Sequence, residues 1–111
     1  MFEGLSVQER TYAFHAGEVE TAFLLHGTPE LVHPAEYTAN YIARVDQPAL
    51  LRPEGSSANF AWLTKDIAPS GVLGDPNGAT AENGERWSNE AAARIAEILV
   101  AMYNFEPRHG V

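Results

Sequence analysis

The chain has 111 residues, of which 45% are hydrophobic, so its composition fits one small globular domain and argues against disorder throughout. It contains no cysteine, which excludes disulfides and thiolate zinc sites, and its formal charge of −8, from 15 acidic and 7 basic side chains, disfavours nucleic acid as a partner. No segment approaches the roughly 20 apolar residues of a membrane span and no export signal opens the sequence, so we expect a cytoplasmic protein with neither nucleic acid nor a membrane as partner.

The first part of the chain predicts a loose lead-in, a strand and a helix. Residues 1–10 are polar and show no periodicity. Residues 11–14, Thr-Tyr-Ala-Phe, are typical of a short buried strand, and residues 22–26 predict a helix that Gly27 ends. Thr28 and Pro29 form the next helix-start signal, because threonine caps helices and proline suits the first turn.

The middle of the chain is mostly irregular. Residues 33–57 are punctuated by prolines and a glycine, with one helical or extended fragment at 41–44. Loops longer than about 12–15 residues are uncommon in compact domains, so we expect this one to pack against something. Residues 59–64 alternate and are rich in aromatic side chains, which predicts a strand that ends near Asp66. The glycines and prolines of residues 69–78 predict tight turns and a close approach of backbone to another surface.

A long helix is predicted from Thr80, as N-cap, toward Asn104, followed by a frayed tail at 105–111. Six apolar side chains recur at helical spacing on one face, and we expect that face to be buried. They are Trp87, Ala91, Ile95, Ile98, Leu99 and Met102. Two helices, two short strands and a long loop are too few to cover both faces of a parallel sheet, so the chain is predicted to complete a larger α/β core.

Residues 15–21, His-Ala-Gly-Glu-Val-Glu-Thr, carry the main chemical signal, at the predicted turn from strand to helix. The crevice beyond the carboxyl ends of parallel strands is where α/β proteins bind ligands. His15 can move protons at neutral pH, although a histidine of this kind can also be structural. Glu18 and Glu20 have a structural alternative too, because carboxylates in a first helical turn interact favourably with the helix dipole.

This motif, together with residues 70–76 (Ser-Gly-Val-Leu-Gly-Asp-Pro) and 79–85 (Ala-Thr-Ala-Glu-Asn-Gly-Glu), resembles the creatininase (creatinine amidohydrolase) family. The resemblance runs from Tyr12 to about Leu99 and covers the C-terminal part of the family only. It implies the C-terminal portion of a three-layer α/β/α fold with a mostly parallel sheet, incomplete in this chain. Residues 1–111 are therefore expected to form a single partial domain.

The resemblance implies a metal-dependent amidohydrolase that hydrolyses a cyclic or linear amide C–N bond. His15 is implied as the proton-transfer residue and Glu20 as a second catalytic residue and candidate metal ligand, with the other ligands outside this chain. Tyr12, Phe14 and Gly17 are the candidate substrate-binding residues. The implied cofactor is a divalent metal, zinc or manganese, in the complete enzyme, with none held tightly by this chain alone.

The implied partners are a small amide substrate, a missing N-terminal part or partner subunit, and further copies in a homo-oligomer. The sequence departs from the family at two places: Ala22 stands where many relatives have serine, and Tyr12 and Ala13 stand where relatives commonly have an aspartate. The alternative is therefore a truncated, non-catalytic module that joins an assembly. His26, His33 and His109 are interpreted as surface or loop residues, Asp75 as a turn residue, and the glycine spacing of 71–78 fits no nucleotide-binding motif.

Overall fold

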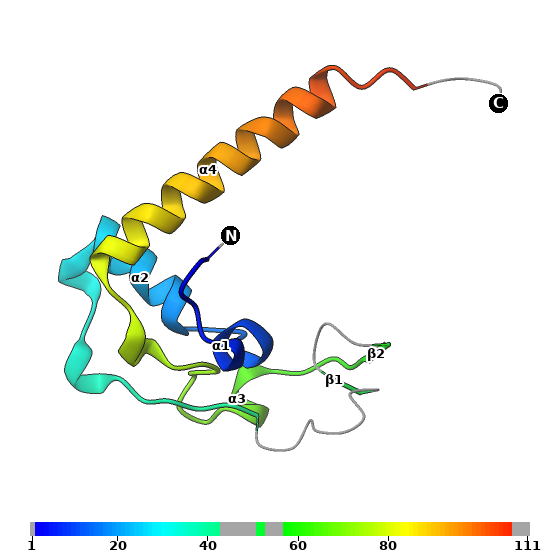
Figure 1. Cartoon of the computed structure of the whole chain (residues 1–111). Helices are drawn as coiled ribbons and strands as arrows, with labels where there is room; N and C mark the ends of the chain where they lie inside the picture. Colours follow the sequence, from blue (N-terminus) through cyan, green and yellow to red (C-terminus); the bar gives the residue numbers. More distant parts are fainter. Residues whose placement is uncertain (1, 43–50, 53–56, 108–111) are drawn as a thin grey trace.

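A computed structural model describes residues 2–42, 51–52 and 57–107, which are mostly helical (Figure 1). The helices are α1 (Val7–Tyr12), α2 (Glu18–Gly27), α3 (Thr64–Ile67) and α4 (Ala81–Tyr103), with 3-10 turns at Pro29–Leu31, Pro34–Glu36 and Pro76–Gly78. The strands β1 (Leu51–Arg52) and β2 (Ala58–Asn59) pair in parallel, with Leu51 opposite Ala58. Within the described residues the expected parallel sheet is thus reduced to this pair.

The long helix α4 confirms the prediction from Thr80 to Asn104. The Thr80 hydroxyl accepts a hydrogen bond from the Asn83 amide at 3.1 Å, which satisfies one of the free N–H groups of the first turn. At the other end, the Asn104 amide donates to carbonyl groups of the last turn. Both helix ends were predictable because caps are local features of the sequence.

The core lies where α4 crosses α2, and Gly84 makes the crossing possible. A Cβ atom at Gly84 would clash with the backbone carbonyl of Ala22, so only glycine lets the two helix backbones approach this closely. Ala22 and Trp87 are fully buried at this contact. The packing therefore offsets the roughly 1 kcal/mol by which glycine disfavours a helix relative to alanine.

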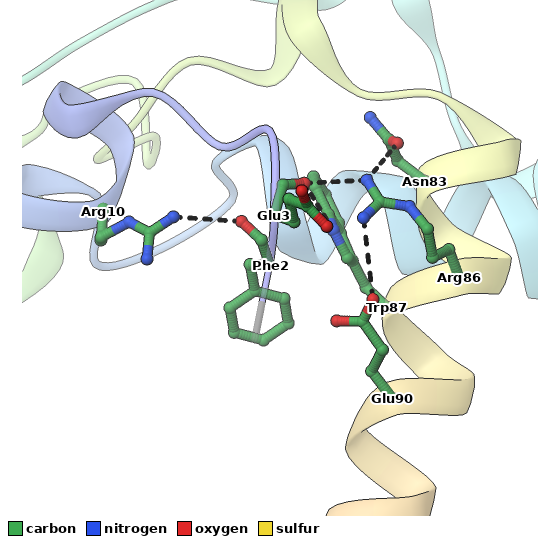
Figure 2. Close-up of polar contacts among 7 residues, drawn as sticks. All are labelled: Phe2, Glu3, Arg10, Asn83, Arg86, Trp87 and Glu90. Atoms are coloured by element: carbon green, nitrogen blue, oxygen red, sulfur yellow. Dashed lines mark hydrogen bonds and ion pairs between the residues drawn. The ribbon is translucent and has the colours of Figure 1, made fainter.

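The N-terminal segment packs on α4, so its interpretation as a loose lead-in was wrong. The Phe2 ring meets the Trp87 ring edge to face, with the centroids 5.8 Å apart. The Glu3 carbonyl accepts hydrogen bonds from the Trp87 indole at 3.2 Å and from the Arg86 guanidinium at 2.8 Å, and Figure 2 shows these contacts gathered on one side of α4. Ser6 then caps α1 by accepting the Glu9 amide proton.

The two predicted strands are not formed. Thr11 and Tyr12 are the last residues of α1, and the next β-type pairing is an isolated bridge from His15, just past the predicted strand, to Leu73. Of the second segment, Asn59 ends β2 and Thr64 begins α3. Aromatic and alternating residues suit a strand only where a neighbouring strand pairs with them. The 41–44 fragment lies partly outside the described residues.

The predicted burial of the α4 face holds only at its N-terminal end. Trp87 is buried, but Ile95 is 57% exposed and Leu99 59%, and Ile98 and Met102 are also exposed. Figure 1 shows why: α4 runs out beyond α2 and the rest of the described chain. Periodicity identifies the face that can be buried, and not whether another element covers it.

We therefore expect Ile95→Ala to change the free energy of unfolding of this chain by less than about 0.5 kcal/mol, as ordinary surface substitutions do. Chemical denaturation followed by circular dichroism measures it. A loss of about 2–5 kcal/mol, the range for a large-to-small change at a buried site, would contradict the exposure of this face.

Candidate active site

Hydrogen bonds to Leu73 fix the backbone at His15. The Leu73 carbonyl accepts the Phe14 amide at 2.7 Å and the His15 amide at 3.2 Å, and the Leu73 amide donates to the His15 carbonyl at 2.9 Å. Leu73 is fully buried, whereas the His15 side chain is 57% exposed. The imidazole is therefore presented to solvent from a backbone that is held on the core.

The turn after His15 is held by Glu20. Ala16 has a φ of +55°, a left-handed conformation that is uncommon for a residue with a side chain. The Ala16 amide, one residue before the N-cap Gly17 of α2, donates to Glu20 Oε2. The same oxygen lies 3.9 Å from His15 Nδ1, close enough for an ion pair when the imidazole is protonated and too far for a hydrogen bond.

Most of the residues predicted for the site line one pocket of about 300 Å³, within the size range of small-molecule sites. Phe14, His15, Gly17 and Glu20 all face it, whereas Tyr12 is not among the lining residues. The other lining residues come from the N-terminal segment, α1 and the first turn of α2; they are Phe2, Leu5, Glu9, Arg10, Ala13 and Val19. The pocket therefore combines an apolar wall, an imidazole, carboxylates and one guanidinium.

Glu9 is a central residue of this region that the sequence reasoning missed. It is only 4% exposed, and its carboxylate accepts three hydrogen bonds: from the Glu18 amide at 2.8 Å, the Tyr41 hydroxyl at 2.6 Å and the Asp75 amide at 2.6 Å. The pattern Ser6-x-x-Glu9 is a capping-box signature, and it is the local signal from which the start of α1 could have been predicted in place of a lead-in. Nothing local indicated that the Glu9 side chain turns inward, because two of its three donors are 32 and 66 residues away.

The surroundings of Glu9 affect two neighbouring titratable groups. Partial burial, reinforced by the nearby Glu9 and Asp75 carboxylates, raises the pKa of Glu18 above its ordinary value. Burial and the hydrogen bond to Glu9 likewise raise the pKa of Tyr41. Asp75 has the predicted turn role, since its carboxylate accepts the Asn77 amide proton at 2.9 Å.

The remaining histidines lie elsewhere. His26 and His33 are exposed, as expected, and neither lines the pocket that holds His15. His109 lies outside the described residues. In the described part of the chain no helix is both long and apolar enough to cross a membrane.

Residues 2–99 match the family model described as creatininase, creatinine amidohydrolase, so the chain belongs to the creatininase family, a family of metal-dependent amidohydrolases with an α/β fold. It is 40% identical over 88 residues to the mycofactocin precursor peptide peptidase of Mycobacterium ulcerans (strain Agy99). That match covers 74% of this chain and 32% of the relative, so the chain spans about a third of the relative's length. No solved structure matches the chain.

The described residues do not fit the metal site that the family implies. Among residues 2–42, 51–52 and 57–107 there is no group of three or more histidine, cysteine or acidic side chains placed to hold a metal ion. Glu20, the one candidate ligand from the sequence, already accepts the Ala16 amide proton. A catalytic zinc needs about three protein ligands, and this donor set does not provide them.

Proposed function

We propose that this chain supplies the proton-transfer histidine, His15, of a metal-dependent amidohydrolase that breaks a cyclic or linear amide C–N bond. The observation that carries the proposal is the placement of the His15 imidazole in a pocket, on a backbone fixed by three hydrogen bonds to Leu73. The family supports hydrolysis of an amide in general. The name of the relative, a precursor peptide peptidase, makes a linear peptide amide one substrate candidate.

The chemistry that His15 performs is proton movement. In amide hydrolysis a water oxygen bonds to the carbonyl carbon, the C–N bond breaks, and the leaving nitrogen must gain a proton. The imidazole takes the proton released by water and delivers it to that nitrogen, the usual function of histidine in general acid–base catalysis. Phe14 and Gly17 form the adjoining wall of the pocket, where the apolar part of a small amide substrate packs. Tyr12, the last residue of α1, does not line this pocket and is given no part in the step.

The proposal places the metal, zinc or manganese, and its ligands on polypeptide outside these 111 residues, either an N-terminal part or a partner subunit. It also places the rest of the three-layer α/β/α fold there, in a cytoplasmic homo-oligomer. Such an ion would polarise the amide carbonyl. The described side chains of this chain do not fit a metal site, so its own contribution is proton transfer.

Reconstitution tests the proposal. The chain is co-expressed with, or fused to, the N-terminal part of a creatininase-family relative, and hydrolysis of creatinine and of short peptide amides is measured. Amide hydrolysis that requires both parts supports the proposal. Hydrolysis by the N-terminal part alone, at the same rate, would contradict it.

A second candidate, a non-catalytic assembly module, is favoured by one observation: α4 leaves Ile95, Ile98, Leu99 and Met102 exposed on one face. Exposed apolar patches mark interaction sites more often than an isolated exposed side chain does. The two candidates differ in the reconstituted assembly. If the chain is a catalytic subunit, a change in the His15 pocket lowers activity. If it is an assembly module, a change in the exposed face of α4 weakens association, and a change in the pocket leaves activity as it was.

For Glu20→Gln we expect turnover in the reconstituted assembly to fall about 10–100-fold with little change in metal content. The amide side chain weakens the hold on Ala16 and misplaces His15, and small misplacements of a catalytic group carry penalties of this size. Glu30→Gln, an exposed glutamate in the Pro29–Leu31 turn, is the control. A fall in metal affinity of about 10–100-fold, measured by metal analysis after dialysis, would instead show that Glu20 holds or orders a metal ligand.

A further inference from the structure

The Glu9 carboxylate joins parts of the chain that are distant in sequence. Its donors belong to the first residue of α2, to Tyr41, and to Asp75 in the glycine-rich segment. Asn40 holds its neighbour Tyr41 near Asp75, because the backbone groups of Asn40 and Gly74 exchange hydrogen bonds at 2.9 and 2.7 Å. The backbone at Leu73 and Gly74 therefore lies between the turn after His15 and the segment at Asn40 and Tyr41. Glu9 accepts hydrogen bonds from Glu18, which follows that turn, and from Tyr41.

The backbone at Gly17 and Gly74 packs closely around the Glu9 carboxylate and leaves no space for a side chain at either glycine. A Cβ atom at Gly17 would lie 2.6 Å from Glu9 Oε2, and one at Gly74 would lie 3.1 Å from Glu9 Oε1 and 2.7 Å from the Gly17 Cα. Real Cβ atoms do not approach other atoms to 2.6 or 2.7 Å. The two glycines thus let the His15 turn and the Gly74 turn close over one buried carboxylate.

The electrostatics of the arrangement favour a carboxylate specifically. The Glu18 amide is one of the free N–H groups at the start of α2, where a negative charge interacts favourably with the helix dipole. All three groups that point at Glu9 are donors, and a carboxylate is an acceptor only. A glutamine of the same shape would present an NH₂ group to at least one of them.

We propose that Glu9 is a positioning residue for His15: its buried carboxylate fixes the start of α2 against Asp75 and Tyr41, and so fixes where the His15 imidazole lies in the pocket. This inference rests on the proposed function of His15. Glu9 acts through the turn that follows His15, and the pocket-facing position of His15 depends on that turn at one end and on Leu73 at the other.

The first experiment does not require a measurement of enzyme activity. Backbone amide hydrogen exchange and the imidazole signals of His15 are measured by NMR in this chain, in Glu9→Gln and in the exposed control Glu85→Gln. In Glu9→Gln we expect the Glu18 and Asp75 amides to exchange at least about tenfold faster and the His15 signals to broaden or split, with the α2–α4 core near Trp87 unchanged. The control should match the unmodified chain.

Two outcomes would overturn the inference: unchanged exchange at Glu18 and Asp75, or equally faster exchange in the α2–α4 core, which would make Glu9 a general fold residue. If Glu9→Gln does not fold, Tyr41→Phe replaces it, because this change removes one donor and keeps the carboxylate. Exchange at Asp75 should then rise by a smaller factor and the His15 signals should shift. No change at either place would overturn the inference.

The second experiment uses the reconstituted assembly. There Glu9→Gln should lower kcat by up to about 100-fold while KM changes little, because a misplaced imidazole affects proton transfer more than substrate binding. A change confined to KM would contradict positioning. If His15→Ala leaves turnover intact while the exchange result holds, the proposed function fails and the structural link between Glu9 and the His15 turn stands.

Discussion

His15→Ala is expected to lower the turnover of amide hydrolysis by about 10²–10⁴ in the reconstituted assembly, the usual contribution of a positioned general acid–base group. Metal content should stay nearly unchanged, because the imidazole is proposed to move protons and not to hold the ion. The measurements are steady-state kinetics and metal analysis of the same preparation. A proton shuttle acts in the transition state, so kcat should fall more than KM rises.

His33→Ala is the matched control for this experiment. His33 is an exposed histidine before the Pro34–Glu36 turn and does not line the pocket that holds His15, so its loss should leave turnover within about twofold. Full activity in His15→Ala would leave only the non-catalytic module as a function for this chain. A loss of metal together with activity would instead make His15 a ligand, or a neighbour of one.

Local sequence signals predicted α2 and α4, whereas α1 and α3 fall where a lead-in and strands were predicted. The cap at Thr80, the spacing of apolar residues and the end near Asn104 are each set by residues within a few positions of one another, and α4 follows them. The same holds for α2, although it begins at Glu18, before the predicted start. The prediction of a strand at residues 11–14 was wrong for a related reason. Ser6 and Glu9 form a local helix-start signal, and the strand-like composition of residues 11–14 obscured it.

The candidate site could be predicted only in part. Phe14, His15, Gly17 and Glu20 are within seven residues in sequence, so a single turn brings them to one pocket. The residues that hold this turn come from elsewhere: Leu73 through backbone hydrogen bonds, and Glu9 through a buried side chain. The Leu73 bonds and the bonds from Tyr41 and Asp75 to Glu9 join residues 32 or more positions apart, which leaves no periodic trace in one sequence, so this support of the site was not predictable from it.

Trp87→Ala should lower the free energy of unfolding by about 3–5 kcal/mol, the range for removing a large buried aromatic side chain. Trp87 is fully buried, its ring contacts Phe2, and its indole donates to the Glu3 carbonyl at 3.2 Å. The change therefore opens a cavity at the α2–α4 crossing and leaves a carbonyl with one donor fewer. Chemical denaturation followed by circular dichroism measures the loss.

Tyr103→Ala is the control on the same helix, because Tyr103 is 90% exposed and its loss should stay within about 0.5 kcal/mol. A small domain is stable by only about 5–15 kcal/mol, so Trp87→Ala removes a large share and lowers the denaturation midpoint markedly. The N-terminal segment should be held less firmly on α4 at the same time, since Phe2 loses its ring contact with Trp87 and the Glu3 carbonyl keeps only the hydrogen bond from Arg86. A loss below about 1 kcal/mol would mean that the α2–α4 crossing is not the core of this chain.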